Sequence, residues 1–325
     1  MTSEPEAGPF RVALVQLCCG RAVAPNLDIA EGLIRRAAAG GADYVQTPEN
    51  TSFMELEAER VAALVQNEED SEPLARFRAL ATELGIWLHI GSLATRIDDT
   101  RIANRSYLIG PDGEIAARYD KLHMFDVDLP NGETYRESQN YRPGEKAVVV
   151  ELPLGRLGLS ICYDLRFPAL YRALATAGAN LIAIPSAFTR QTGAAHWRIL
   201  VRARAIETGA FVLAATQGGT HENGRQTFGH SIIVSPWGEV LAEAGEDPTV
   251  IFADIDPAES AAARARIPAL RHGRDIDVAP FQAQQPRRLF RNRLQHHLLE
   301  VIAVPTLPVV RIALEHDPRA LLPLP

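Results

Sequence analysis

The stretch "RLGLSICYDLRFPALYRALATAG" (156–178) passes directly from a short apolar run to a helical pattern. The apolar run alternates large and small residues, as a strand with one crowded face would. Pro168 suits the first turn of a helix, and Gly178 suits its end. The stretch therefore predicts a strand over 156–162 and a helix over 168–177, with a sharp elbow between them.

Similar short apolar runs alternate with helical patterns along most of the chain, which is typical of an α/β fold. Asp112-Gly113, between two apolar runs, indicates a hairpin and hence an antiparallel part of the sheet. Asn26 is the expected N-cap of the first helix. The other predicted strands cover 11–17, 43–48, 87–94, 146–152, 180–185, 210–216, 229–235 and 250–256. The other predicted helices cover 26–40, 194–208 and 257–266.

The composition is that of an ordinary globular protein, with 46% hydrophobic and 22% charged residues among 325. The net charge of -7 provides no basic field for a phosphate backbone, so we expect no nucleic-acid binding. There is no apolar run of about 18 residues and no secretory signal pattern, so we expect a cytoplasmic protein outside the membrane. The three cysteines, Cys18, Cys19 and Cys162, are too few for a disulfide framework and should be reduced.

The sequence changes character near residue 285. Residues 285–325 begin with a basic segment and continue as an apolar one that prolines interrupt repeatedly. We expect one domain over 10–284, followed by a loosely ordered C-terminal extension of unknown role. The alternative is an arm that docks on a partner. The extension is too short and too rich in proline to span a bilayer.

Three side chains could carry chemistry. Cys162 ends the small-residue face of its strand, and an elbow could expose it and bring helix N-terminal amides near its sulfur, favouring the thiolate. Lys121 continues the apolar face of its strand, so it either points inward or follows a strand that ends at Asp120. Glu49 follows a predicted buried strand. Taken singly, a packed cysteine, a solvated lysine and a solvated loop glutamate remain open interpretations.

One reaction would use all three groups. A cysteine that attacks a carbonyl needs a base for its proton, a donor for the developing oxyanion and an acid for the leaving amine. Glutamate and lysine can fill those roles. Sequence spacing alone does not show that the three side chains meet.

Five motifs, in order along the chain, resemble those of the nitrilase superfamily of carbon-nitrogen hydrolases. They are "PEN" (48–50), "YDKLHMFDVDLP" (119–130), "YRES" (135–138), "GLSICYDLRFP" (158–168) and "GHSIIVSPWGEV" (229–240). The resemblance covers about Phe10 to Phe281. It implies that Glu49, Lys121 and Cys162 are the catalytic set, with Glu137 as the family's additional glutamate.

The resemblance also implies an architecture and a mechanism. The expected fold is a four-layer αββα sandwich of two mixed sheets flanked by helices, paired into at least a homodimer. Cys162 would attack an amide and form a thioester. Lys121 and the backbone N–H of Tyr163 would hold the oxyanion, and Glu137 would hold Lys121. No metal and no cofactor are expected.

The segments "PSAFTRQTGAAHW" (185–197) and "RARAIETGAFVLAATQGG" (202–219) are most similar to the deaminated glutathione amidase branch. The expected reaction converts deaminated glutathione to 2-oxoglutarate and cysteinylglycine. An omega-amidase acting on 2-oxoglutaramate and an N-carbamoyl amino acid amidohydrolase are the alternatives, and nitrile hydrolysis is less expected. The extension beyond residue 281 departs from the usual length of this branch.

Substrate contacts are predicted around the elbow and the segment that follows it. Arg166 is a candidate fork for a substrate carboxylate, because guanidinium matches that geometry. The alternative is an internal ion pair with Asp164 or another acid. Phe188 and Thr189 are expected to line the pocket. Trp197 is expected to pack in the core on the apolar stripe of its helix.

Other readings are less favoured. His123, Asp126 and Asp128 lie in one loop but lack a recognised metal-ligand spacing. A papain-like peptidase could use His196 or His230 as its base, yet the local peptidase signatures are missing.

A third alternative is an inactive relative that binds amides or acts as a scaffold. The intact catalytic set argues against it, whereas an unreactive Cys162 thiol with a high pKa would favour it.

Overall fold

The computed structural model describes residues 8–130, 132–274 and 276–277. The described residues up to Gly273 form one compact unit. The predicted domain boundary at residue 284 and the extension 285–325 lie outside the described residues, so both stay predictions. Among the described residues, no helix combines the length and apolar character that a membrane span requires.

The first sheet has seven strands in the order β17-β1-β2-β4-β5-β6, with β3 paired to β4. The central pairs β1–β2 and β2–β4 are parallel, whereas β1–β17, β4–β5 and β5–β6 are antiparallel. The predicted hairpin at Gly113 joins β5 to β6, and Gly113 has the positive φ of 78° that its turn requires. The strands are β1 (Phe10–Gln16), β2 (Tyr44–Gln46), β3 (Gln66–Asn67), β4 (Trp87–Asp98), β5 (Arg101–Ile109), β6 (Ile115–Asp120) and β17 (Thr249–Ile255).

The second sheet has six strands in the order β16-β15-β12-β11-β10-β9. It is also mixed, with β10, β11 and β12 parallel to one another. Its strands are β9 (Val148–Leu152), β10 (Gly155–Leu159), β11 (Leu181–Ala183), β12 (Phe211–Ala214), β15 (Ile232–Val234) and β16 (Val240–Glu243). Two further ribbons pair β7 (Asp126–Asp128) with β8 (Thr134–Arg136), and β13 (Gly218–Thr220) with β14 (Gln226–Phe228).

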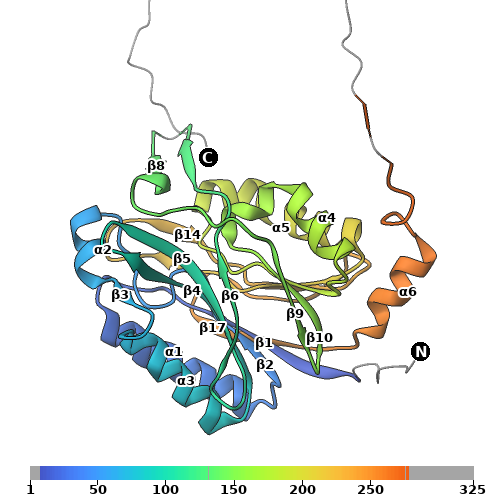
Figure 1. Cartoon of the computed structure of the whole chain (residues 1–325), viewed down its shortest axis with the longest axis horizontal. Coiled ribbons are helices and arrows are strands. Elements are labelled where there is room, and N and C mark those ends of the chain that lie inside the picture. The colour runs from blue at the N-terminus through green and yellow to red at the C-terminus, as the bar shows by residue number, and fades with distance from the viewer. Residues whose placement is uncertain (1–7, 131, 275, 278–325) are drawn as a thin grey trace, which may run out of the picture. The chain divides into compact units, whose positions relative to one another are not determined.

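Helices cover the outer faces of both sheets (Figure 1). Two helices, α1 (Val23–Ala39) and α3 (Glu72–Leu84), pack against the first sheet, and α4 (Pro168–Thr176) and α5 (Arg190–Thr208) pack against the second. The layers therefore follow the order helix, sheet, sheet, helix, and the predicted αββα sandwich is confirmed. The remaining helical elements are α2 (Ala58–Leu64), η1 (Glu137–Gln139), η2 (Cys162–Arg166) and α6 (Ala258–Arg266).

Two of the three hydrophobic clusters among the described residues hold the layers together. One joins α1 and α3 to the first sheet, and includes Leu27, Ile34 and Phe77. The other fills the space between the sheets and continues to α4 and α5. Trp197 of α5 is fully buried in it, which confirms the predicted packing of this side chain. Burying one such side chain contributes roughly 1.5–3 kcal/mol, so the sheets form a stiff frame for the loops at their ends.

The helix predicted over 26–40 begins earlier, at Val23, because Pro25 is tolerated in a first turn. The prediction that Asn26 is its N-cap is wrong. Asn26 is buried, and its amide donates to the carbonyl oxygens of Gly20 and Ser52 at 2.9 and 3.0 Å. Its oxygen accepts from the Gly20 N–H at 2.8 Å. The side chain therefore ties two loops together.

The helix predicted over 194–208 also begins earlier, at Arg190, and Thr189 is its N-cap. Gly193 weakens the helical pattern there, because glycine has a low helix propensity. Packing explains the glycine, since a Cβ atom at position 193 would lie 2.3 Å from the Cβ atom of Phe228.

Candidate active site

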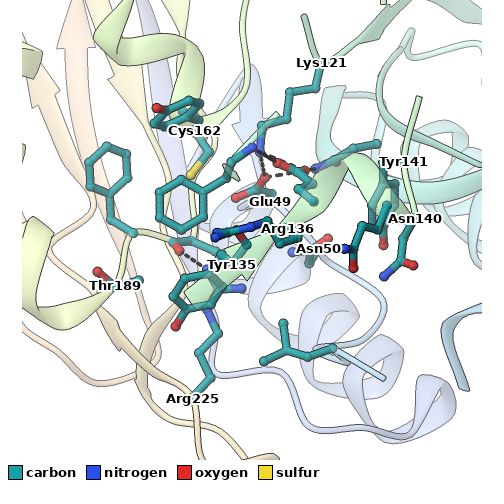
Figure 2. Close-up of a pocket in the computed structure, with 18 of the residues that line it drawn as sticks. Glu49, Asn50, Lys121, Tyr135, Arg136, Asn140, Tyr141, Cys162, Thr189 and Arg225 are labelled. Atoms are coloured by element: carbon teal, nitrogen blue, oxygen red, sulfur yellow. Dashed lines mark hydrogen bonds and ion pairs between the residues drawn. The ribbon is translucent and has the colours of Figure 1, made fainter. Parts of the chain in front are cut away.

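A cavity of about 310 Å³ lies among the loops at one edge of the sheets. Its lining brings together the side chains of Glu49, Lys121, Glu137 and Cys162. They come from the loop after β2, the end of β6, η1 and η2. In Figure 2 the Glu49 carboxylate and the Lys121 ammonium lie beside the Cys162 sulfur. The four side chains that the sequence placed together by resemblance therefore meet in one cavity.

Glu49 lies two residues beyond the buried Thr47 at the end of β2, and only 3% of it is exposed. Its backbone carbonyl accepts a hydrogen bond from the Gln217 side chain at 3.0 Å. Gly91 on β4 lets this loop pass close by, because a Cβ atom there would lie 2.2 Å from the Thr47 oxygen and 2.4 Å from the Pro48 oxygen. The loop is thus fixed by Gln217 on one side and by the close packing on Gly91 on the other. This fixes the position of the Glu49 side chain.

Lys121 follows directly on β6, which ends at Asp120. A strand that ends at Asp120 is what the interpretation of Lys121 as a solvated side chain required. Lys121 is nevertheless only 2% exposed and points inward. Its Nζ atom donates to Glu49 Oε1 at 2.8 Å and to Glu137 Oε2 at 2.8 Å. Two carboxylates therefore compensate the buried ammonium, and the solvated reading of Lys121 is wrong.

Asn104 on β5 is a member of this cluster that the sequence analysis missed. Its amide nitrogen donates to Glu49 Oε1 at 2.9 Å and to Glu137 Oε1 at 3.1 Å. A flipped amide would point its oxygen at both carboxylates, so these partners fix its orientation. The sequence carries no distinct signal for it, because the same strand also holds Arg105 and Ser106.

Cys162 is the first residue of η2 and adopts a positive φ of 50°. The strand predicted over 156–162 ends at Leu159, because the Ile161 N–H leaves the ladder and donates to Asp164 Oδ2 at 2.8 Å. The predicted elbow is confirmed, with α4 beginning at Pro168. The left-handed backbone conformation, uncommon for a residue with a side chain, turns the thiol into the cavity.

The surroundings of the Cys162 thiol favour its protonated form. Burial raises the pKa of Cys162 strongly, and the Glu49 charge raises it further. Lys121 and the Ala187 N–H act in the opposite direction but do not overcome the first two. The expectation that the elbow favours the thiolate is therefore wrong in its net direction, because the adjacent carboxylate outweighs the local amides.

The two partners of the thiol are charged. Burial favours the neutral acid of Glu49, but the Lys121 charge and hydrogen bonds from Lys121 and Cys162 hold its pKa below the usual range. Burial likewise opposes the Lys121 ammonium, but the charges of Glu137 and Glu49 raise its pKa well above the usual value. A neutral thiol thus faces an ionised carboxylate that can take its proton, so the raised pKa of Cys162 does not by itself favour the inactive scaffold alternative.

Arg166 extends from η2 along the cavity wall. Its guanidinium lies 5.3 Å from the Phe188 ring centre, and its Nη1 atom is 3.3 Å from His196 Nδ1. The alternative pair with Asp164 does not form. Asp164 instead accepts from the Tyr119 hydroxyl at 2.7 Å and contacts His123 Nδ1 at 2.6 Å. In the described part of the chain, no carboxylate pairs with Arg166.

The remaining predicted contacts also lie near the cavity. Phe188 and Thr189 both line it. The Thr189 hydroxyl already accepts from the Thr192 N–H at 3.3 Å as the cap of α5. Tyr163 lines the cavity too, and within the described chain no neighbouring carbonyl accepts its backbone N–H.

The residues of the metal-site and peptidase interpretations have other contacts or lie outside the cavity lining. His123 stacks on Phe167 with ring centres 3.6 Å apart, and Asp128 pairs with Arg136 at 2.6 Å. Neither His196 nor His230 is among the described residues that line the cavity.

Residues 11–265 match the family model described as carbon-nitrogen hydrolase. The chain is 40% identical over 268 residues to the deaminated glutathione amidase of Yersinia enterocolitica, across 82% of this chain and 93% of that protein. It is 37% identical over 271 residues to the omega-amidase NIT2 of Xenopus tropicalis, across 82% and 95%. The crystal structure of Saccharomyces cerevisiae Nit3, a member of branch 10 of the nitrilase superfamily, superposes with a TM-score of 0.73 at 30% identity, across 82% of this chain and 97% of that one. The chain belongs to the carbon-nitrogen hydrolase family.

Proposed function

We propose that this enzyme is a thiol amidase that cleaves the amide bond of deaminated glutathione and releases 2-oxoglutarate and cysteinylglycine. The observation that carries the proposal is the buried ion pair of Lys121 and Glu49, at 2.8 Å, beside the Cys162 thiol. Burying three polar groups in this way is costly, and a reaction that uses each of them gives a reason for it.

The first half of the reaction forms a thioester. Glu49 takes the thiol proton as the Cys162 sulfur attacks the amide carbon. Although the pKa of Cys162 is raised, a base hydrogen-bonded to the thiol is in place to remove its proton during the attack. Lys121 and the Tyr163 backbone N–H stabilise the oxyanion. The tetrahedral intermediate collapses when Glu49 returns the proton to the leaving amine, and cysteinylglycine departs.

The second half releases the acyl group. Glu49 is again a carboxylate and takes a proton from a water molecule, whose oxygen attacks the thioester carbon. The second tetrahedral intermediate uses the same oxyanion donors. Its collapse breaks the carbon–sulfur bond and restores the Cys162 thiol, which regains a proton through Glu49. Glu137 acts through Lys121, whose ammonium it holds and compensates.

The substrate is inferred from the relatives and from the cavity wall. The Yersinia relative carries the name deaminated glutathione amidase. Arg166, which has no carboxylate partner in the described chain, is free to bind the 2-oxo acid carboxylate of the acyl group beside Phe188. Thr189 and Phe188 shape the same wall.

The test is a comparison of kcat/KM for deaminated glutathione, 2-oxoglutaramate and an N-carbamoyl amino acid, because this ratio reports transition-state discrimination. We expect deaminated glutathione to be preferred by about tenfold or more, as extra substrate contacts of a few kcal/mol would produce. A clear preference for the carbamoyl compound would overturn the substrate assignment but not the thiol mechanism.

A second candidate is an omega-amidase, favoured by the identity of 37% to the Xenopus protein of that name. The two functions share the acyl group and differ in the leaving group. A higher kcat/KM for 2-oxoglutaramate than for deaminated glutathione would select this candidate.

We also propose that the enzyme is a homodimer in the cytoplasm. Three large apolar side chains, Ile199, Ile206 and Trp237, are 70%, 56% and 51% exposed, which suits burial against a second copy. The three cysteines are free, as expected in a reducing compartment. Light scattering would give twice the chain mass, and I199E with I206E would reduce it to one chain.

A further inference from the structure

A second arginine without a carboxylate partner faces the same cavity. Arg225 lies in the turn between β13 and β14, and its guanidinium lies 5.4 Å from the Tyr135 ring centre. Its Nη2 atom donates to the Ala187 oxygen at 2.6 Å, and its Nη1 atom lies 3.6 Å from Met54 Sδ. Figure 2 shows the side chain reaching up to Tyr135 at the cavity. These contacts fix the guanidinium in one position.

Arg225 forms no ion pair within the described chain. Its Nε atom is buried and has no hydrogen-bond partner there. Two other cations of the cavity, Arg136 and Lys121, differ in this respect. Arg136 pairs with Asp128 at 2.6 Å, and Lys121 pairs with two glutamates. An ordered guanidinium with a free buried donor is suited to an anionic group brought by the substrate.

Arg225 and Arg166 reach the cavity from different elements, although Arg225 donates to Ala187 and Arg166 packs on the next residue, Phe188. Arg166 extends from η2, the element that carries Cys162 and would hold the acyl group. Arg225 packs on Met54, in the loop that follows Glu49, and its positive charge helps to lower the Glu49 pKa. Glu49 would protonate the leaving amine, so the leaving group lies on the side of that loop. Arg225 is therefore an unpaired cation on the side of the cavity where the leaving group is expected.

Deaminated glutathione has two carboxylates, one on each side of the bond that breaks. One belongs to the 2-oxo acid of the acyl group, and the other ends the cysteinylglycine. We propose that Arg225 binds the carboxylate of the leaving group and so selects 2-oxo acid amides whose amine ends in a carboxylate. This inference rests on the proposed function and adds a specificity-determining residue to it.

The experiment compares wild type with R225Q on three substrates: deaminated glutathione, its C-terminal amide and 2-oxoglutaramate. The last two lack the leaving-group carboxylate. R225Q should lower kcat/KM for deaminated glutathione by about 30-fold, the range of one charge-assisted hydrogen-bonded pair, and mainly through KM. It should change kcat/KM for the other two substrates by less than about threefold.

Two variants sharpen the comparison. R225K keeps the charge and should recover part of the loss for deaminated glutathione only. R190Q is the matched control, because Arg190 also has a buried Nε atom without a hydrogen-bond partner, but it pairs with Glu246 at 2.7 Å and is not among the described residues that line the cavity. It should leave all three kcat/KM values within about threefold of wild type.

The outcomes separate the two proposals. Equal losses on all three substrates, or no loss on deaminated glutathione, would overturn the role of Arg225 while the amidase function stood. A wild-type enzyme that preferred 2-oxoglutaramate, or cleaved no 2-oxoglutaryl amide, would overturn the substrate assignment and the role of Arg225 with it. A selective loss of activity on deaminated glutathione in R225Q would support both.

Discussion

The chemistry of this site rests on how a few buried side chains share charge. Lys121 lies between two carboxylates, and Asn104 donates to both of them from the other side. This network keeps Glu49 ionised although it is buried, and an ionised Glu49 is the base that a protonated Cys162 requires. For the reactivity of Cys162, the positions of the Glu49 carboxylate and the Lys121 ammonium therefore matter more than a low pKa of the thiol.

Asn104 should act as a positioning residue. N104L removes the donor to Glu49 and Glu137 with little change in volume. We expect kcat to fall by about 10- to 100-fold, because two hydrogen bonds to charged groups are lost, with a smaller change in KM. Asn140 lines the same cavity, so N140L is the control. Wild-type kcat in N104L would show that the network does not hold Glu49.

Two short elements place the reactive groups, and each depends on a backbone requirement. The elbow at Cys162 needs a positive φ, and the loop at Glu49 needs Gly91 opposite it. Sequence patterns predicted the elbow, since Pro168 and Gly178 mark the helix that follows. They misplaced the starts of α1 and α5, because tertiary contacts of Asn26 and Gly193 override local helix signals.

G91A tests the element that carries Glu49. A Cβ atom there would lie 2.2 Å from the Thr47 oxygen, so the loop before Glu49 must move. We expect a loss of about 1–3 kcal/mol in the free energy of unfolding and a fall in kcat of about tenfold or more. G32A is the matched control, because nothing lies within 4 Å of a Cβ atom in that part of α1. An unfolding curve and kcat of G91A equal to those of wild type would contradict this account.

At the scale of the whole molecule, the sandwich brings together residues from distant parts of the chain. Glu49 and Lys121 come from loops of the first sheet, and Cys162 comes from the second. Strand patterns predicted most of the strands and the hairpin at Gly113, whereas the division into two sheets was expected only from the family resemblance. They could not show that the three groups meet, because this depends on how one sheet packs on the other. Only the resemblance of five motifs supplied that expectation, and Asn104 and Arg225 fell outside it.

A buried histidine in the first sheet makes the free energy of unfolding depend on pH. His89 is fully buried between the Tyr44 hydroxyl at 2.7 Å and Ser106 Oγ at 2.6 Å, and burial lowers its pKa to about 3. The unfolded chain takes up a proton near the ordinary histidine pKa of about 6.5, whereas the folded one does not. Stability is therefore lost as pH falls from about 6.5 towards 3, by about 1.4 kcal/mol per pH unit from this group.

Urea unfolding from pH 7 to pH 4 measures this slope. H89Q should reduce the slope by about 1.4 kcal/mol per pH unit below pH 6, whatever its stability at pH 7. H272Q, at an exposed histidine, should leave it unchanged. An H89Q slope equal to that of wild type would mean that His89 becomes protonated in the folded protein.

The most direct test of the central claim is the intact mass of the enzyme quenched during turnover of deaminated glutathione, followed by mapping of the modified peptide. We predict a mass increase of one 2-oxoglutaryl group on Cys162 in the wild type. The folded C162A variant should show no increase and no turnover. An adduct on another residue, or turnover near the wild-type rate in C162A, would contradict the account.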